Sequence, residues 1–344
     1  MILTKQQVLN TNKAIVTEKV LTVEDLHVSF TTFGGEVQAL RGVTFDLYKG
    51  ETLAIVGESG CGKSVTANTI MGLIPQPPGK IKNGKVLFKE KNLVKMSKSR
   101  LRKVQGVDIS MIFQDPMTAL NPTLQIGEQL TEGLRTHQKL SKAAAYTKAI
   151  EMLNMVGIPN PKERMKQYPH QFSGGMRQRI VIAIALICEP ELLIADEPTT
   201  ALDVTIQAQI LELFIEIQKK MGVSIILITH DLGVVAKIAD RIAVMYAGKI
   251  IETGDKREIF YTPQHPYTKG LLNSVPRLDL LEEELQPIEG TPPDLFSPPK
   301  GCPFTDRCPF AMEVCGEVYP ESTERSKTHV VDCWLQDERS KLFS

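Results

Sequence analysis

The stretch "TLAIVGESGCGKSVTANTIMGLI" covers residues 52–74 and decides the fold of this chain. It begins with a short apolar segment, passes through "GESGCGKS" (57–64) and continues into a segment with the composition of a helix. The middle part matches GxxxxGK[ST], a pattern in which glycines let backbone N–H groups wrap around phosphate oxygens. A strand before the motif and a helix after it are the context it requires, so the sequence predicts a phosphate-binding loop within an α/β core.

The predicted loop supplies both backbone and side-chain groups. Lys63 brings a positive charge to the β- and γ-phosphates of a nucleotide, and the Ser64 hydroxyl suits Mg²⁺. Val65 is expected to contribute only its backbone. The expected nucleotide contacts come from consecutive residues: Gly57, Glu58, Ser59, Gly60, Cys61, Gly62, Lys63, Ser64 and Val65.

The rest of the chain predicts the parts around this loop. Apolar runs at 52–56, 108–113, 192–196 and 223–229 are typical of a buried parallel sheet with flanking helices. Alternating patterns over 21–47 and from residue 84 predict an N-terminal antiparallel β subdomain, after a loose arm of about twenty residues. The sequence turns helical over about 115–179, which predicts a helical subdomain insert. We therefore expect an α/β phosphate-loop core over 20–260, followed by a small cysteine-containing module over 261–344.

Polar residues follow three of the predicted strands, at the ends where an α/β sheet binds ligands. Asp196 is expected to hold Mg²⁺ through water, and Glu197 to act as general base toward an attacking water. His230 suits a contact to the terminal phosphate, although a lone histidine is usually structural. The Gln114 amide suits Mg²⁺ or the water, or simply a capped turn.

The composition of the chain argues against a nucleic-acid-binding surface and against a membrane span. Lysine plus arginine equals aspartate plus glutamate, 40 against 40 in 344 residues, so a basic surface for nucleic acid is not expected. The longest apolar run, Ile180–Cys188, has nine residues, whereas a membrane span needs roughly 20. The N-terminal residues show no signal-peptide pattern. We expect a cytosolic chain with reduced cysteines.

The ordered motifs resemble those of the ATPase subunit of ATP-binding-cassette transporters. The discriminating stretch is "FSGGM" (172–176), which other phosphate-loop ATPases lack. The remaining shared motifs are the phosphate loop, Gln114, "LLIADE" (192–197), "TALD" (200–203) and His230. Phe172 and Met176 depart from the commoner leucine and glutamine, but neither position needs its side chain to bind phosphate.

The resemblance implies ATP and Mg²⁺ as ligands and a head-to-tail pair of cassettes. Each ATP would lie between the phosphate loop of one chain and the signature residues Ser173, Gly174 and Gly175 of the other. Asp203 would lie at the same interface, although it also fits a helix N-cap. The implied adenine-stacking residue is Phe33, with Phe30 as the alternative, and either could instead pack within the strands.

The C-terminal stretches "HPYTKGLL" (265–272), "SVPRLD" (274–279) and "GTPPDLFSPPKGCPF" (290–304) are similar to the oligopeptide and dipeptide importer branch. This implies an ATP-hydrolysing subunit that powers oligopeptide import, with a dipeptide or another small solute as the alternative. The implied partners are a second, different ATPase, two integral membrane permease subunits and, indirectly, an extracellular peptide-binding protein. The implied place is peripheral, on the cytoplasmic face of the cell membrane.

Four late cysteines, Cys302, Cys308, Cys315 and Cys333, follow the spacing C-x5-C-x6-C-x17-C. This is not the spacing of common zinc sites. Four thiolates hold either zinc or a [4Fe–4S] cluster, and four buried thiols are the plain alternative. The resemblance favours the [4Fe–4S] cluster, with zinc as the alternative. Cys61 and Cys188 are expected only to fill space.

Two other classes of protein share part of this pattern. A soluble cassette ATPase of DNA repair or translation usually carries two cassettes or long coiled coils, whereas this chain has one cassette and no heptads. A non-catalytic nucleotide-binding regulator is disfavoured because both Glu197 and His230 are present. Co-purification with integral membrane subunits would separate the importer from both.

Overall fold

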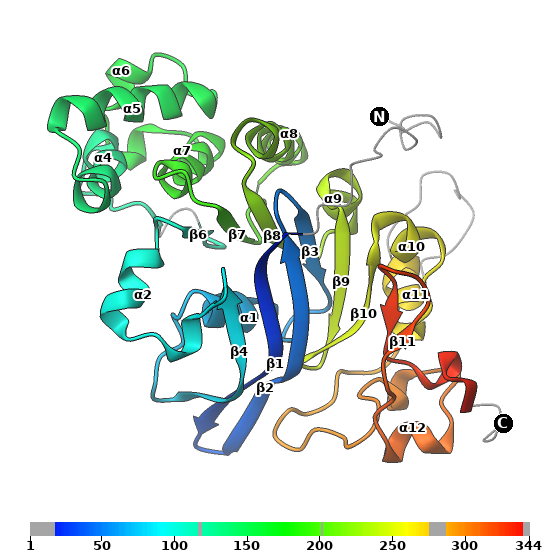
Figure 1. The fold of residues 1–344 in the computed structure, drawn as a ribbon. Coiled ribbons are helices and arrows are strands. Elements are labelled where there is room, and N and C mark those ends of the chain that lie inside the picture. The colour runs from blue at the N-terminus through cyan, green and yellow to red at the C-terminus, as the bar shows by residue number, and fades with distance from the viewer. Residues whose placement is uncertain (1–17, 116–118, 201, 275–286, 340–344) are drawn as a thin grey trace.

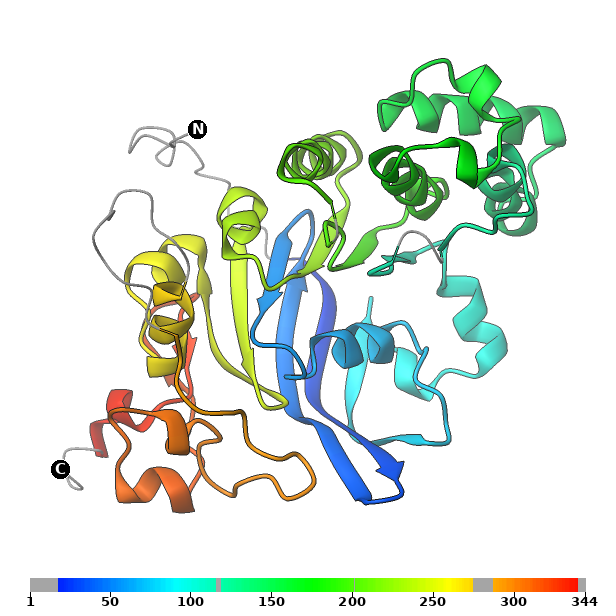
Figure 2. The ribbon, with the colours of Figure 1, turned by 180° about the vertical axis from the view of Figure 1, so that it is seen from behind.

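The structure is a computed structural model that describes residues 18–115, 119–200, 202–274 and 287–339. Its described part contains a 4-stranded sheet in the order β2–β1–β4–β5 and an 8-stranded sheet in the order β11–β12–β10–β9–β3–β8–β7–β6 (Figures 1 and 2). Most of the loose arm expected at the N-terminus lies outside the described residues.

The centre of the large sheet is the predicted parallel sheet. Its strands are β3 (Thr52–Val56), β6 (Ile109–Ile112), β7 (Leu192–Asp196) and β8 (Ser224–Ile228). Each of these strands is buried along its whole length, which is why each is mostly apolar and lacks the alternation of a half-exposed strand. Their pairing is parallel throughout, so their carboxyl ends meet at one edge.

A hairpin that the sequence analysis did not predict extends this sheet. β9 (Arg241–Tyr246) pairs in parallel with β3, and β10 (Lys249–Asp255) returns antiparallel to it. Both residues of the tight turn, Ala247 and Gly248, have positive φ, of 46° and 79°. The apolar run before "AGK" is the signal that could have revealed this hairpin.

Residues near the C-terminus complete the edge of the same sheet. β12 (Val330–Val331) pairs with β10, and β11 (Thr323–Glu324) pairs with β12. The division of the chain near residue 260 stays a prediction, as does the extent of the helical part, whose residues 116–118 lie outside the described residues.

The small sheet is antiparallel, as predicted. It consists of β1 (Lys19–Thr32), β2 (Gly35–Tyr48), β4 (Gly79–Phe88) and the short β5 (Lys91–Asn92). Its apolar face, α1 (Lys63–Ile70) and one face of the large sheet share a hydrophobic core that includes Leu21, Ile70 and Ile194. The helix that follows the phosphate loop is thus held between the two sheets.

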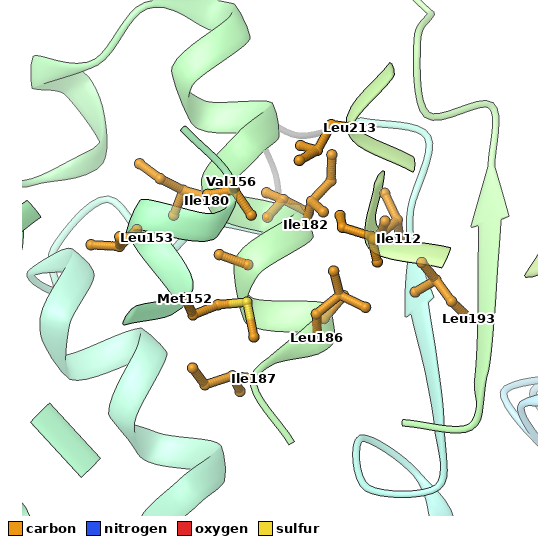
Figure 3. Packing of buried hydrophobic residues seen from close by; sticks show 14 of the residues in the cluster. Ile112, Met152, Leu153, Val156, Ile180, Ile182, Leu186, Ile187, Leu193 and Leu213 are labelled. Atoms are coloured by element: carbon orange, nitrogen blue, oxygen red, sulfur yellow. The ribbon is translucent and has the colours of Figure 1, made fainter. Parts of the chain in front are cut away.

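The helical part packs on the opposite face of the large sheet. It contains α4 (Ile126–His137), α5 (Lys142–Met155), α6 (Pro161–Arg164) and α7 (Gly174–Leu186). Figure 3 shows the α7 side chains Ile182 and Leu186 between α5 residues such as Met152 and strand residues such as Ile112. α8 (Val204–Met221) joins this core through one face, on which Ile210, Leu213, Phe214 and Ile217 are buried.

A third hydrophobic core packs against β3, β9 and β10. It is formed by α9 (Leu232–Ile238), α10 (Lys256–Tyr261), α11 (Pro266–Asn273) and residues around α12 (Glu313–Glu317). α2 (Lys98–Val104) lies at the other side of the molecule (Figure 1). Within the described ranges, no helix has both the length and the apolar character needed to cross a membrane.

Candidate active site

The phosphate loop, residues 57–64, connects β3 to α1 and needs its glycines. Gly57 has φ 153°, and a Cβ there would stand 2.1 Å from the carbonyl oxygen of Met245. Gly62 has φ 109°, and a Cβ there would meet the Ala39 carbonyl oxygen at 2.8 Å. The loop therefore runs against the backbone of β9 and β2, and only glycine fits at these two positions.

Lys63 begins α1, and its side chain turns back over the loop. The Lys63 Nζ donates to the carbonyl oxygens of Gly57 at 2.8 Å and of Glu58 at 2.9 Å. It also lies 3.7 Å from the Cys61 sulfur. The ammonium group is buried within the loop, where a phosphate would meet a concentrated positive charge.

Ser64, in the first turn of α1, meets Asp196, the last residue of β7. The Ser64 hydroxyl donates to Asp196 Oδ1 at 3.1 Å. Burial raises the pKa of the Asp196 carboxyl, and the hydrogen bond from Ser64 offsets this only in part. A hydroxyl beside a buried carboxylate is an oxygen-rich corner of the kind Mg²⁺ prefers.

Three predicted polar residues from different strand ends converge. Glu197, directly after β7, accepts a hydrogen bond from Gln114 Nε2 at 2.9 Å and lies 3.3 Å from His230 Nδ1. The Thr200 hydroxyl donates to the same carboxylate at 3.0 Å. Burial works to raise the pKa of Glu197, but the hydrogen bonds from Thr200 and His230 outweigh it, so the pKa lies below its ordinary value. Glu197 is thus held as a carboxylate, the form a general base requires.

The signature residues lie at the start of α7. The Ser173 hydroxyl accepts a hydrogen bond from the Met176 N–H at 3.4 Å, and Asp203 caps α8 by accepting from the Ile206 N–H at 2.9 Å. A Cβ on Gly175 would meet Ile206 at 2.8 Å, so the two helix starts lie side by side. Within the described residues, no hydrogen bond or ion pair connects 173–175 to 57–65, and Figure 1 shows α7 and α1 in different parts of the molecule.

The two candidate aromatic residues differ in environment. Phe33, at the turn between β1 and β2, is fully exposed, whereas Phe30 packs against the core between the sheets. Phe33 is the more exposed of the two, which favours it over Phe30 for stacking on a base.

Comparisons with known proteins agree with this geometry. Residues 40–200 match the family model described as ABC transporter, and residues 251–315 match oligopeptide/dipeptide transporter, C-terminal region. The dipeptide transport ATP-binding protein of Bacillus subtilis is 70% identical, over 94% of this chain and 97% of that relative. The chain belongs to the ABC transporter ATPases.

Further relatives of this ABC ATPase point to the same family. The oligopeptide transport ATP-binding protein of Bacillus subtilis is 61% identical, over 92% of this chain and 89% of the relative. The dimeric structure of a bacterial ABC transporter cassette is similar with a TM-score of 0.62 and 27% identity, covering 69% of this chain and 99% of that one. The predicted family and α/β fold class are therefore confirmed, and the chain is an ATP-hydrolysing cassette.

The C-terminal region of the ABC ATPase brings its four cysteines to one small cavity. Cys302, Cys308, Cys315 and Cys333 line it together with His265. Burial, with smaller effects from the neighbouring thiols, raises the pKa of Cys302 to about 11 and of Cys333 to about 12. Among the described residues, however, no group of three or more histidine, cysteine, aspartate or glutamate side chains is arranged to hold a metal ion. The predicted [4Fe–4S] cluster is thus not supported by this arrangement. Cys61 and Cys188 are buried, as expected of residues that fill space.

Three residues that were not predicted as site residues lie near the phosphate loop or Glu197: Thr200, Tyr267 and Arg307. Thr200 was quoted only as part of a motif, yet its hydroxyl contacts the Glu197 carboxylate. Tyr267 lies within the quoted stretch "HPYTKGLL" and Arg307 lies just after the last quoted stretch, and both contact Glu58 of the phosphate loop. Nothing in the local sequence of Tyr267 or Arg307 signals a contact with Glu58, which lies 209 and 249 positions away from them.

Proposed function

We propose that this ABC ATPase powers the import of oligopeptides across the cell membrane. The observation that carries the proposal is the match of residues 251–315 to the oligopeptide/dipeptide transporter C-terminal region, alongside the cassette match. Relatives named for dipeptide and for oligopeptide transport both align over more than nine-tenths of the chain, so dipeptides are the alternative substrate.

The proposed partners follow from membership of a transporter family. Two integral membrane permease subunits would hold the chain at the cytoplasmic face of the membrane, and an extracellular peptide-binding protein would deliver the peptide to them. A second, different ATPase would pair with this chain head to tail. The position of the signature turn, away from the chain's own phosphate loop, supports such pairing, because Ser173, Gly174 and Gly175 present free helix N-terminal amides to a partner.

The proposed nucleotide site consists of residues 57–65, with Phe33 stacking on adenine. Lys63 and the backbone amides of the loop would bind the phosphates, while Ser64, Asp196 and Gln114 would hold Mg²⁺ directly or through water. When bound, Mg²⁺ neutralises charge on the β- and γ-phosphates. The close contact between the Ser64 hydroxyl and the Asp196 carboxylate supports this ligand set.

Hydrolysis needs a base and an oriented water. Glu197 would accept the proton of the attacking water, since its lowered pKa keeps it ionised at neutral pH. Gln114 and His230 would orient the water and contact the terminal phosphate, and both already contact the Glu197 carboxylate. The signature residues of the partner chain, with Asp203, would close the site.

The four late cysteines are proposed as ligands of a [4Fe–4S] cluster, with zinc as the alternative. The four thiols line one small cavity with His265, whose Nδ1 accepts from the Tyr267 N–H and whose buried Nε2 has no hydrogen-bond partner among the described residues. A buried ring N–H without an acceptor, on a residue that lines a cavity of thiols, suits a sulfur-rich group. Iron and sulfide near four per chain in anaerobically purified protein would support the cluster, one zinc per chain would replace it, and no metal would leave packed thiols.

Peptide uptake tests the proposed function. In an amino-acid auxotroph that lacks the chromosomal copy, the wild-type gene should restore growth on peptides that contain the required amino acid, and a Glu197→Gln gene should not. Growth on pentapeptides would support oligopeptide import, whereas growth on dipeptides alone would favour the alternative. Unchanged uptake of every peptide length after deletion of the gene would contradict the proposal.

A further inference from the structure

Glu58, the second residue of the phosphate loop, is held by two side chains from the C-terminal region. Its N–H donates to the Tyr267 hydroxyl oxygen at 2.9 Å, and its carboxylate accepts two hydrogen bonds from Arg307, at 2.8 and 3.0 Å. Its carbonyl oxygen accepts from Lys63 Nζ at 2.9 Å. Every polar group of Glu58 is therefore engaged, and one of its partners is the loop lysine itself.

Arg307 is itself fixed, because all five N–H groups of its guanidinium have acceptors. Besides the two bonds to Glu58, Nε donates to the Glu289 carbonyl at 2.8 Å, and Nη2 to the Ile288 carbonyl at 3.1 Å. Nη1 also donates to the Tyr246 hydroxyl at 3.1 Å. The side chain is only 5% exposed. A lysine could not reproduce this planar fork, so the position requires arginine.

Tyr267 is fixed in a different way. Its side chain is fully buried, and its ring packs against Tyr246 with 4.5 Å between ring centroids and against Phe304 with 5.4 Å. Its N–H donates to His265 Nδ1 at 3.0 Å. The packing of the ring therefore fixes the hydroxyl oxygen where it accepts from the Glu58 amide.

The Arg307–Glu58 pair also sets the charge of the loop. Glu58 places a carboxylate within a segment whose amides and lysine suit phosphate, and its side chain is still 27% exposed. An unpaired carboxylate there would repel a nucleotide, whereas the bidentate arginine neutralises it.

We propose that Arg307 and Tyr267 are positioning residues for nucleotide binding that act through Glu58. Arg307 cancels the charge of Glu58 and fixes its side chain, while Tyr267 fixes its backbone. The C-terminal region, through α11 and residues 287–339, thereby sets the ATP affinity of the cassette. This inference rests on the proposed assignment of residues 57–65 to nucleotide binding.

Calorimetric titration of the full-length chain with ATP and Mg²⁺ tests the inference. Arg307→Met should weaken ATP binding roughly tenfold, since it leaves a partly buried carboxylate unpaired beside the phosphates. The matched control is Arg339→Met, because Arg339 pairs with Asp337 and Glu321 away from the loop and should leave affinity unchanged. Adding Glu58→Gln to Arg307→Met should recover most of the affinity, which a merely structural role of Arg307 would not produce.

Tyr267→Phe keeps the packing and removes one hydroxyl, so it tests the second contact without threatening the fold. It should weaken ATP binding about threefold to tenfold, the worth of one hydrogen bond to a buried amide. Tyr319→Phe is the control, since the Tyr319 hydroxyl donates to Asp332 in the same region but far from the loop. In the assembled ATPase, Tyr267→Phe should raise KM for ATP and leave kcat unchanged.

The variant Lys63→Ala distinguishes a wrong assignment of the phosphate loop from a wrong positioning role for Arg307 and Tyr267. If Lys63→Ala does not weaken ATP binding, the phosphate-loop assignment itself is wrong. If Lys63→Ala abolishes binding while Arg307→Met and Tyr267→Phe both stay within about twofold of wild type, the positioning role is overturned. If the double variant Arg307→Met/Glu58→Gln binds ATP as weakly as Arg307→Met alone, Arg307 does not act by neutralising the charge of Glu58.

Discussion

Replacing Glu197 by glutamine should stop ATP hydrolysis while leaving ATP binding intact. Oε2 of Glu197 accepts from both Gln114 and Thr200, and Oε1 faces His230. A glutamine with its amide oxygen in the Oε2 position keeps the first two hydrogen bonds, and its amide nitrogen can donate to a neutral His230 ring. We therefore expect a loss in unfolding free energy of about 1 kcal/mol or less.

The loss in rate should be much larger than the loss in stability. A general base contributes roughly 10²–10⁴-fold to a rate, which corresponds to about 3–5 kcal/mol of transition-state free energy. ATP affinity should stay the same or increase, because one negative charge near the phosphates is removed and no residue of 57–64 hydrogen-bonds to Glu197.

The assay is phosphate release by the assembled transporter at saturating ATP, together with ATP titration of the full-length chain. Glu191→Gln is the matched control, because Glu191 precedes the other end of β7 and pairs with the surface residue Lys89. It should retain normal turnover. Near-normal turnover by Glu197→Gln would refute the assignment of the base, and a collapse of ATP affinity would refute the view that Glu197 stands apart from the binding loop.

Three further outcomes are expected. Thr200→Val removes a hydrogen bond that lowers the pKa of Glu197, so the pKa should rise and the acid limb of the rate–pH profile should move to higher pH; an unchanged limb would mean that Glu197 does not control it. Ser173→Arg should leave ATP binding to the isolated chain unchanged but prevent ATP-dependent pairing, as measured by light scattering, and a loss of isolated-chain affinity would contradict the head-to-tail arrangement. Gly57→Ala should lower the unfolding free energy by at least about 3 kcal/mol in a denaturant titration, because its Cβ would collide with the Met245 carbonyl; a variant as stable as wild type would show that the loop can shift.

Much of the fold could be predicted because its signals are local. The buried strands β3, β6, β7 and β8 are continuous apolar runs, and α8 begins at a capping aspartate and ends at Gly222 with φ 69°. The phosphate loop is the strongest case, since its glycines and lysine act within eight consecutive residues. The β9–β10 hairpin was missed, although its turn also has a local signal.

The sequence by itself determined the phosphate loop, the parallel strands and the residue types at their carboxyl ends. These features depend on backbone conformation and apolar patterning within a few residues, which a sequence displays directly. Parallel pairing also made the meeting of Gln114, Glu197 and His230 predictable, since strand ends share one edge. Only the tertiary structure decided that Arg307 neutralises Glu58 across 249 positions, that Tyr267 holds the Glu58 amide, and that four widely spaced cysteines share a cavity. Contacts of this kind arise because two surfaces pack together, and their free energy comes from burial and charge pairing between segments whose local sequences carry no mark of each other.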